Sequence, residues 1–272
     1  MEGCASAPAP DVIDVWAWRL DRPPAEVAGL ASLLSPDETD RASRFVTARD
    51  ANRYVVARAN MRIVLGNRLG TPPCDLTFAY NDFGKPRLVL KGAAPPHFNL
   101  SHSGALAMLA ISDRFPLGID IEEMKPVEED IAGYFFSARE RASLVRVPQS
   151  DYLQAFYRCW TRKEALVKAR GEGLTIALDS FDVSVGERAT LDLSRLQDEP
   201  TGRGRWELRN LDVPPGFQGA VAALTDGAPV WLRHHGDPRV DRDLTNLRSA
   251  TAHPECNGLR PNRNDDIRSA SA

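Results

Sequence analysis

Helix start signals occur at two separate places in this chain of 272 residues, and each is followed by helical and then strand-like segments. "SPDE" (Ser35–Glu38) and "SARE" (Ser137–Glu140) both have the form of a capping box, in which serine and glutamate bond each other's backbone N–H groups. The strict alternation of strands and helices that predicts a parallel sheet is missing. We therefore predict an α+β fold with two similar halves that meet near residue 117, although no clear sequence repeat is visible.

The expected elements divide the chain into three parts. An N-terminal half, residues 11–117, carries a strand at 11–20, helices from residue 35 and over 47–70, a strand pair within 76–90, and a strand-like run at 97–112. A C-terminal half, residues 118–235, carries a helix over 151–169, which Ser150 caps and "GEG" (171–173) ends, followed by strand-like runs. Residues 236–272 are polar and poor in large apolar side chains, and we expect them to be disordered.

Charge and cysteine usage exclude several classes of protein. The net charge of −3 comes from 34 basic and 37 acidic residues, which gives no sign of nucleic-acid binding. No signal peptide and no apolar run of about 18 residues is present, so we expect a cytoplasmic protein without a membrane partner. The four cysteines have neither CxxC nor Cys/His ligand spacing, so they predict no zinc site and no disulfide framework.

The stretch "LGIDIEEM" (Leu117–Met124) places two acids inside an apolar strand. Residues two apart on a strand share a face, so Asp120 and Glu122 should project together while Ile119 and Ile121 face the core. A strand with one solvated face explains this pattern. In a sheltered site, however, two carboxylates about 4 Å apart repel by roughly 4 kcal/mol at an effective dielectric near 20. Either an arginine or a hard cation such as Mg²⁺ would relieve that repulsion.

A third acid, Glu164, interrupts the apolar stripe of the helix over 151–169. An ordinary i,i+4 pair with Lys168 explains it. Alternatively, Glu164 completes a set of three carboxylates for a divalent ion, while Lys163 and Lys168 supply positive charge for a phosphate.

Further polar residues precede these motifs. "FNLSHS" places Ser101 and His102 in what we predict to be a turn between strands, where they serve either as structural hydrogen-bonding groups or as phosphate contacts. "GxSxG" is absent, so a serine hydrolase is not indicated. Lys85 lies in the turn "FGKP". The helices near residues 35–53 carry four arginines, which form either an exposed basic face or a phosphate contact: Arg41, Arg44, Arg49 and Arg53.

Together these motifs resemble the surfactin-type 4′-phosphopantetheinyl transferases. "FNLSHS" (98–103) is similar to the first core motif of that family, "GIDIE" (118–122) to the second, and "FYRCWTRKEALVKARGEGL" (156–174) to the third. The resemblance extends over about residues 12–235 and is most specific in the third motif. The third motif keeps Phe156, Trp160, Lys163, Glu164, Ala165, Lys168, Gly171, Gly173 and Leu174.

The resemblance implies a pseudodimer whose active site lies in the cleft between two similar α+β halves. Such an enzyme moves the phosphopantetheine arm of coenzyme A to a serine of an apo acyl carrier protein or peptidyl carrier domain, releases 3′,5′-ADP, and acts as a monomer. Carriers of secondary metabolite biosynthesis are typical substrates of the family.

By the same resemblance, each motif residue receives an expected role. Asp120, Glu122 and Glu164 would hold Mg²⁺. The expected catalytic residues are Glu164 as the base, Lys168 at the leaving group, and His102. The expected coenzyme A contacts are Ser101, His102, Lys85, Lys163, Lys168, Arg41, Arg44, Arg49 and Arg53.

Two other functions stay open at this stage. The metal set alone also allows a Mg²⁺-dependent hydrolase of a pyrophosphate or phosphodiester, and the phosphate contacts alone allow a non-catalytic nucleotide-binding module. Labelling of a carrier protein distinguishes the transferase from both. The segment Met124–Phe136 is expected to contact the carrier.

Overall fold

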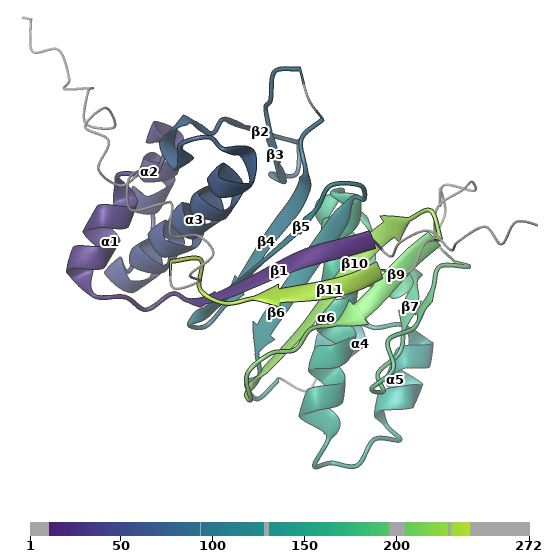
Figure 1. Cartoon of the computed structure of the whole chain (residues 1–272). Helices are drawn as coiled ribbons and strands as arrows, with labels where there is room; N and C mark the ends of the chain where they lie inside the picture. Colours follow the sequence, from purple (N-terminus) through teal and green to yellow (C-terminus); the bar gives the residue numbers. More distant parts are fainter. Residues whose placement is uncertain (1–10, 93, 128–130, 196–204, 228–229, 240–272) are drawn as a thin grey trace, which may run out of the picture.

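A computed structural model describes residues 11–92, 94–127, 131–195, 205–227 and 230–239 (Figure 1). The predicted disorder of the tail concerns mainly residues outside this part. Residues 236–239 are described, and they bind the first half: Asp237 pairs with Arg22, and Arg239 pairs with Glu26.

Several helices begin and end where the sequence signals predict, but the cap predicted for Ser150 is wrong: Asp151 is the N-cap residue of α6, and its side chain makes no capping hydrogen bond. Both capping boxes form, at Ser35 with Glu38 and at Ser137 with Glu140. The two long helices end at glycines with positive φ, Gly70 (62°) and Gly171 (74°), a conformation that has little cost only without a side chain. The α-helices are α1 (Pro24–Ala31), α2 (Pro36–Ser43), α3 (Ala48–Leu69), α4 (Ile131–Phe135), α5 (Ala138–Leu144) and α6 (Tyr152–Arg170).

The strands form two main sheets and two short hairpins. The first main sheet has the order β11-β1-β5-β4 and the second has the order β6-β10-β9, while β2 pairs with β3 and β7 with β8. All pairings are antiparallel except that of β1 with β11. The strands are β1 (Asp11–Arg19), β2 (Phe78–Tyr80), β3 (Pro86–Leu88), β4 (His97–Ser103), β5 (Leu106–Ser112), β6 (Leu117–Glu123), β7 (Asp182–Val183), β8 (Leu191–Asp192), β9 (Arg205–Asn210), β10 (Phe217–Thr225) and β11 (Val230–His235).

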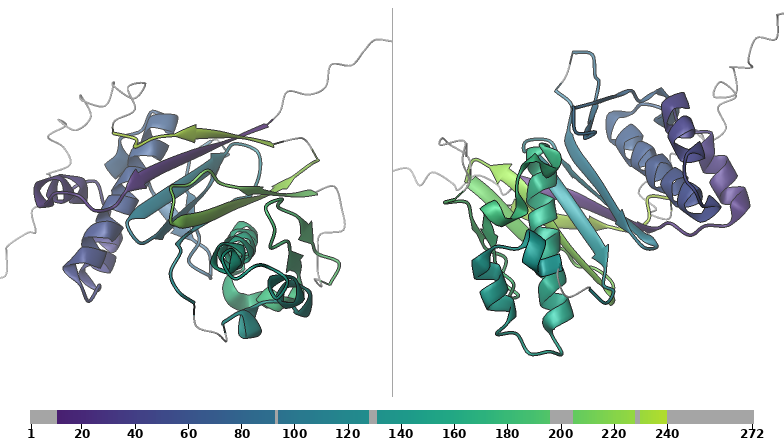
Figure 2. Two further views of the ribbon diagram at one scale, coloured as in Figure 1. Left: turned by 90° about the horizontal axis from the view of Figure 1, so that it is seen from below. Right: turned by 180° about the vertical axis from the view of Figure 1, so that it is seen from behind.

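The two main sheets pack face to face between two layers of helices. Every residue of β5 is buried, because one of its faces packs against the core of α3 and the other against the core that β6 and β10 share with it. Helix α6 covers the outer face of the second sheet, where Ala220 and Ala222 belong to its core. Figure 2 shows α1–α3 and α4–α6 on opposite sides of the strands.

The two halves repeat one arrangement. In the first half, β1 pairs with β5 and β5 pairs with β4. In the second half, β6 pairs with β10 and β10 pairs with β9, which is the same arrangement. In each, the buried glutamate of a capping box binds a cation on the long helix: Glu38 binds Arg62 at 2.6 Å, and Glu140 binds Lys163 at 2.7 Å. This repeat confirms the predicted α+β fold with two similar halves.

A seam of side chains joins the halves where the edge strands β4 and β6 meet. Three polar side chains of β4 accept hydrogen bonds from backbone N–H groups of β6 at a constant separation of 20 residues: Asn99 from Ile119 (2.8 Å), Ser101 from Ile121 (3.3 Å) and Ser103 from Glu123 (3.1 Å). Edge-strand N–H groups that would otherwise lack partners are thereby satisfied.

Three details differ from the sequence expectations. Residues 97–112 form two strands with a turn at Gly104–Ala105, so Ser101 and His102 lie within β4 and not in a turn. Strand β11, which we assigned to the second half (118–235), belongs to the sheet of the first half. Cys74 is disulfide-bonded, which the cysteine spacing did not predict. None of the helices in the described ranges has the length and apolar character needed to cross a membrane.

Candidate active site

The acidic pair lies on β6 at the seam, as the alternation of the strand predicts. Ile119 and Ile121 are buried in the core between the sheets, while Asp120 and Glu122 point to the opposite face. Gly118 shares that face. A Cβ atom there would lie 2.2 Å from the backbone nitrogen of Ala169, so the glycine lets α6 pack directly against the strand.

Helix α6 brings a third carboxylate and an ammonium group to this pair. Lys168 Nζ lies 2.5 Å from Asp120 Oδ1 and donates to the Ser101 hydroxyl at 3.0 Å, and that hydroxyl donates to Asp120 Oδ1 at 3.1 Å. Glu164 lies one turn before Lys168 on the same face of the helix. Ser101, Asp120 and Lys168 therefore form a closed triangle that ties β4, β6 and α6 together.

The two glutamates of the site have raised pKa values. Burial raises the pKa of Glu122, and the neighbouring Asp120 adds to this, although Ser103 donates a hydrogen bond at 2.6 Å that opposes it. Burial also raises the pKa of Glu164, and the charges of Asp120 and Glu122 act in the same direction. The three carboxylates are thus close enough to repel one another.

His102 and Arg53 face this acidic set from the first half. Desolvation lowers the pKa of His102, and the charges of Lys168 and Arg53 contribute, so the imidazole is the neutral form near pH 7. Arg53, in the first turns of α3, binds Asp21 through both oxygens at 2.7 and 2.8 Å. The arginine therefore stands beside His102 in a fixed position.

A cavity of about 310 Å³ opens next to Glu164 and Lys168. Phe83 and Leu100 line it from the first half and Val167 from the second, so the cavity lies between the halves. Its walls combine apolar side chains with the carboxylate of Glu164 and the ammonium groups of Lys85 and Lys168, which suits a ligand with an uncharged arm and a charged end.

The donor set fits a hard divalent cation, although no group of three His, Cys, Asp or Glu side chains in the described ranges already has the arrangement of a metal site. Asp120 Oδ2 is buried and has no hydrogen-bond partner, and Lys168 holds the other oxygen. An unpartnered buried carboxylate oxygen beside two glutamates with raised pKa values is an environment that Mg²⁺ would stabilise.

Lys163 does not reach this site, so its expected contact with coenzyme A is wrong. Its ammonium group is fully buried, where it pairs with Glu140 at 2.7 Å and donates to the carbonyl oxygens of Leu178 (2.6 Å) and Phe181 (2.8 Å). Every proton of the group is used inside the second half. The lysine is the counterpart of Arg62 in the first half and stabilises the packing of α5 on α6.

Lys85 and Ser101 lie at the site, but their polar groups are already engaged by protein atoms. Lys85 Nζ donates to three backbone carbonyls, those of Leu117, Lys168 and Ala169. The Ser101 hydroxyl bonds Asp120, Lys168 and the Ile121 N–H group. The direct phosphate contacts predicted for these two residues would require them to give up these bonds.

The four arginines do not form one cluster. Arg41 and Arg44 line a groove of about 550 Å³ on α2, together with Asp37, Asp40 and Phe45. Arg49 lies in the first turn of α3, and its charge helps to lower the pKa of Asp21. Only Arg53 influences His102.

The sequence reasoning missed three residues that shape the site: Asn99, Ser103 and Gly118. Asn99 and Ser103 lie two residues to either side of Ser101, so the period of a strand places all three on one face. Gly118 lies two residues before Asp120 and shares its face in the same way. The signal was therefore present once β4 was recognised as a strand.

Comparison with known proteins identifies relatives of this chain. The model of the 4′-phosphopantetheinyl transferase superfamily matches residues 116–224, and that of the 4′-phosphopantetheinyl transferase N-terminal region matches residues 18–114. The 4′-phosphopantetheinyl transferase Sfp of Bacillus subtilis is 31% identical over 212 residues, which cover 77% of this chain and 92% of that protein. HetI of Nostoc sp. is 34% identical over 220 residues, which cover 80% of this chain and 90% of HetI. A solved ACPS–CoA complex of Chronobacterium ammoniagenes has a TM-score of 0.32 and 17% identity, and covers 41% of this chain and 96% of its own.

Proposed function

This chain belongs to the 4′-phosphopantetheinyl transferase superfamily, and we propose that the cleft at the seam of its two halves is where its reaction takes place. The protein transfers the 4′-phosphopantetheine arm of coenzyme A to a serine of an apo carrier protein and releases 3′,5′-ADP. The observation that carries the assignment of the site is Asp120, whose buried oxygen without a partner lies among two further carboxylates and a lysine.

Asp120, Glu122 and Glu164 would hold Mg²⁺, which supplies positive charge against the pyrophosphate of coenzyme A when it is bound. These three carboxylates and the arrival of the pyrophosphate make the site strongly negative. Lys168 and Arg53 border it and offset that charge, while the neutral His102 can supply a hydrogen bond.

Glu164 is the general base in this proposal. Its carboxylate is buried next to Asp120 and Glu122, and in the metal-free site burial and these two charges raise its pKa, which favours acceptance of a proton. The serine Oγ forms a bond to the phosphorus that carries the pantetheine arm, its proton passes to Glu164, and the bond from that phosphorus to the bridging oxygen breaks. The electron pair leaves with 3′,5′-ADP, and Lys168 donates a hydrogen bond to the phosphate of this leaving group.

The arm and the carrier approach from different sides of this centre. The uncharged pantetheine arm fits the cavity beside Glu164, whose apolar walls are Phe83, Leu100 and Val167. Of the segment Met124–Phe136, the structure describes all but residues 128–130. Tyr134 is 76% exposed and Phe135 is 40% exposed, so both are available to an apolar patch on a carrier. A single chain contains both halves, so the proposed enzyme works as a monomer, and we further propose that it acts in the cytoplasm.

A labelling assay tests this function. The protein, Mg²⁺, coenzyme A and a panel of apo carriers, including fatty-acid, polyketide and nonribosomal-peptide carriers, are incubated together, and mass spectrometry should find one phosphopantetheine added to the carrier serine. Cleavage of coenzyme A without labelling of any carrier would contradict the proposal and favour a hydrolase.

The base assignment has its own test. Glu164→Gln should lower kcat by about 10²- to 10⁴-fold, the usual contribution of a general base, with a much smaller change in coenzyme A affinity. Equal losses in kcat and in affinity, measured by kinetics and by calorimetry, would assign Glu164 to substrate binding instead. Ile63→Val is the matched control, because Ile63 in α3 and Glu164 in α6 each lie seven residues before the glycine that ends their helix.

A further inference from the structure

The turn between β2 and β3, in the first half, covers the C-terminal end of α6 in the second half. Asn81 Nδ2 donates to the carbonyl oxygen of Gly171 at 2.7 Å. Lys85 Nζ donates to the carbonyl oxygens of Lys168 (2.6 Å), Ala169 (3.1 Å) and Leu117 (3.0 Å). Two side chains of one short turn therefore make four hydrogen bonds across the boundary between the halves.

These bonds satisfy groups that a helix end leaves without partners. The last four carbonyl groups of an α-helix have no N–H donor within the helix, and those of Lys168 and Ala169 are among them in α6. An ammonium group has three protons, and here each proton has one carbonyl acceptor. A positive charge at this position is also favoured by the helix dipole, whose C-terminal end is negative.

The turn has a fixed shape that presents Lys85 in this direction. The Asn81 side-chain oxygen accepts hydrogen bonds from the backbone N–H groups of Phe83 (3.1 Å) and Lys85 (2.8 Å). Gly171 has no side chain, and the Lys85 Cδ atom lies only 3.2 Å from where a Cβ of residue 171 would be. Within the described residues, Lys85 forms no ion pair with an acid, so its partners are these carbonyls.

The bonded carbonyls belong to the two elements that carry the reacting groups. Leu117 begins β6, three residues before Asp120, and Lys168 is itself the residue whose ammonium group binds Asp120. Lys85 thus connects the backbone of the strand with Asp120 to the backbone of the helix with Glu164 and Lys168.

We propose that Lys85 is a positioning residue: from the first half of the chain it fixes the last turn of α6 against β6 and so holds Glu164 and Lys168 in place beside Asp120. This inference rests on the proposed transferase reaction. It differs from a direct phosphate contact, because an ammonium group bonded to three carbonyls has no proton left for a phosphate.

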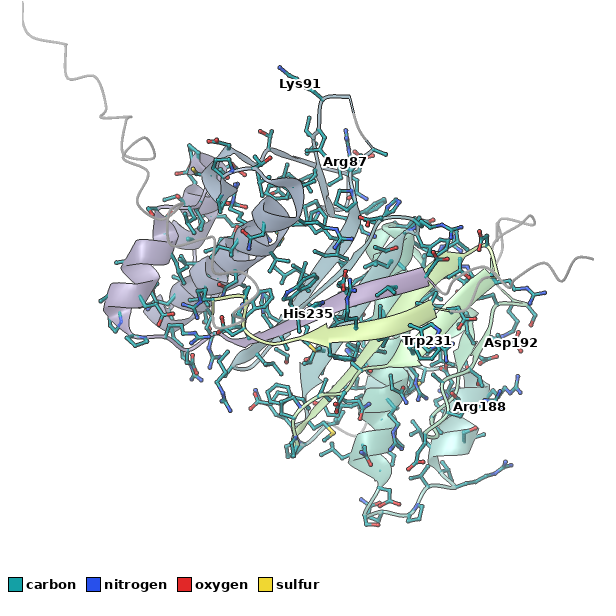
Figure 3. The ribbon with its side chains drawn as sticks, in the orientation of Figure 1. Arg87, Lys91, Arg188, Asp192, Trp231 and His235 are labelled. Atoms are coloured by element: carbon teal, nitrogen blue, oxygen red, sulfur yellow. The ribbon has the colours of Figure 1, made fainter. Side chains whose placement is uncertain are left out.

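The test compares Lys85→Met with Lys91→Met, a control in the loop after β3 whose side chain points away from the molecule (Figure 3). Carrier labelling gives kcat and the KM for coenzyme A, and amide hydrogen exchange reports on residues 164–172. We expect Lys85→Met to lower kcat by about 10- to 100-fold, since small displacements of reacting groups have effects of this size, to change KM less than about twofold, and to speed exchange at the end of α6.

The expected control result is wild-type behaviour in both measurements. A raised KM with unchanged hydrogen exchange would overturn the proposal and restore the phosphate contact. Wild-type kcat and exchange in Lys85→Met would overturn it as well.

Asn81→Asp provides a second variant in case Lys85→Met does not fold. It keeps the acceptor for the turn and removes the donor to Gly171, and Asn81 is exposed, so the fold tolerates the change. We expect the same two effects in smaller size, and an unchanged variant would contradict the proposal. If the wild-type protein labels no carrier, the proposed function fails, while the exchange measurements still report separately whether the turn holds the helix.

Discussion

Asp14 and Asp120 occupy equivalent positions in the two halves of the chain, on the first strand of each main sheet. Their surroundings in sequence are similar, "VIDVW" (12–16) and "GIDIE" (118–122). Each is buried and binds a cation of the long helix next to it: Asp14 pairs with Arg68 at 3.0 Å and Asp120 with Lys168 at 2.5 Å. Only the second aspartate keeps an oxygen without a partner.

The residues around the two aspartates explain this difference. In the first half, β11 adds Arg233 and His235, which bind the remaining oxygen of Asp14, and the His235 ring stacks on Trp16. In the second half, β4 places the small Ser101 beside Asp120. Ile63 and Glu164 each lie seven residues before the glycine that ends their helix, so they correspond to each other. Trp16 and Glu122 correspond because each lies two residues after the aspartate of its half. One framework therefore holds a neutralised aspartate in one half and an acidic cluster in the other.

The largest expected effect comes from removing the aspartate of the acidic cluster. Asp120→Ala should lower kcat in the labelling assay by about 10²- to 10³-fold or more, because the site loses its central carboxylate and the anchor of Lys168. Thermal unfolding should show that the variant is folded. An Asp120→Ala enzyme with wild-type turnover would remove the distinction between the two positions.

The same substitution in the other half should affect stability instead of chemistry. Asp14→Ala leaves Arg68, Arg233 and His235 without their common acceptor, so we expect the free energy of unfolding to fall by about 2 kcal/mol. Turnover per folded molecule should stay at the wild-type level. A large loss of kcat in folded Asp14→Ala would show that Asp14 and its partners also contribute to the reaction.

The third prediction concerns the packing of the long helix on its strand. Gly118→Ala would place a methyl group 2.2 Å and 2.3 Å from backbone atoms of Ala169 and Ala165, which a side-chain rotation cannot relieve. We expect a loss of stability of about 1–3 kcal/mol, as for other overpacked cores, and a loss of turnover as α6 moves away from β6. Val12→Ala, at the equivalent and partly exposed position of β1, should change neither quantity by much. The difference between the two variants in urea unfolding and in labelling checks the prediction.

The smallest expected effect is a difference in how stability depends on pH at Asp14 and at the acidic cluster. Burial alone would raise the pKa of Asp14, but hydrogen bonds from Arg233, His235 and Arg68 outweigh it and lower that pKa, so its contribution to stability is present above pH 3.8 and is lost as the pH falls through its folded pKa. The raised pKa values of Glu122 and Glu164 act in the opposite direction. Their contribution is present below pH 4.5 and is lost as the pH rises through their folded pKa values.

Urea unfolding between pH 3 and 8 without metal separates the two contributions. Asp14→Asn should have a lower free energy of unfolding than wild type at neutral pH, and this difference should shrink as the pH falls. For a Glu122→Gln, Glu164→Gln double variant, the free energy of unfolding relative to wild type should increase as the pH rises toward neutral. Mg²⁺ at neutral pH should raise the Tm of wild type but not that of the double variant. A wild-type Tm that does not respond to Mg²⁺ would contradict the proposed metal site.

Local patterns in the sequence predicted much of this framework, because capping and strand alternation depend on residues a few positions apart. Both capping boxes, the ends of α3 and the shared face of Asp120 with Glu122 follow from such patterns. The roles of the lysines on α6 were less accessible. Lys168 lies one turn after Glu164 and shares its face, whereas Lys163 is its immediate neighbour and points elsewhere, toward Glu140. The helical period shows that Lys163 and Lys168 lie on different faces of α6. It does not show that Lys163 is buried, because that depends on the packing of α5 against its face.

Long-range pairings were not predictable from the sequence. Strand β4 ("FNLSHS") lies parallel to β6, the first strand of the second half, and β11 ("VWLRHH") lies parallel to β1, the first strand of the first half. The resemblance between these two segments becomes visible only from these equivalent positions. Lys85 illustrates the same limit, since an exposed-looking turn lysine gave no sign that its acceptors lie more than 80 residues away, at the end of α6.

Strand β11 also has a consequence for how the chain folds as it is synthesised. Asp11 is paired with Val230, so the sheet of the first half lacks its last strand until almost the whole protein has left the ribosome. Contacts between residues so far apart in the chain form slowly, and an unpaired strand edge can associate with other chains in the meantime. The residues of the acidic cluster all precede residue 171, but their strand β6 pairs with β10 (Phe217–Thr225), so the second sheet is also completed late. Both main sheets therefore reach their final form only after the residues of the reaction centre have emerged.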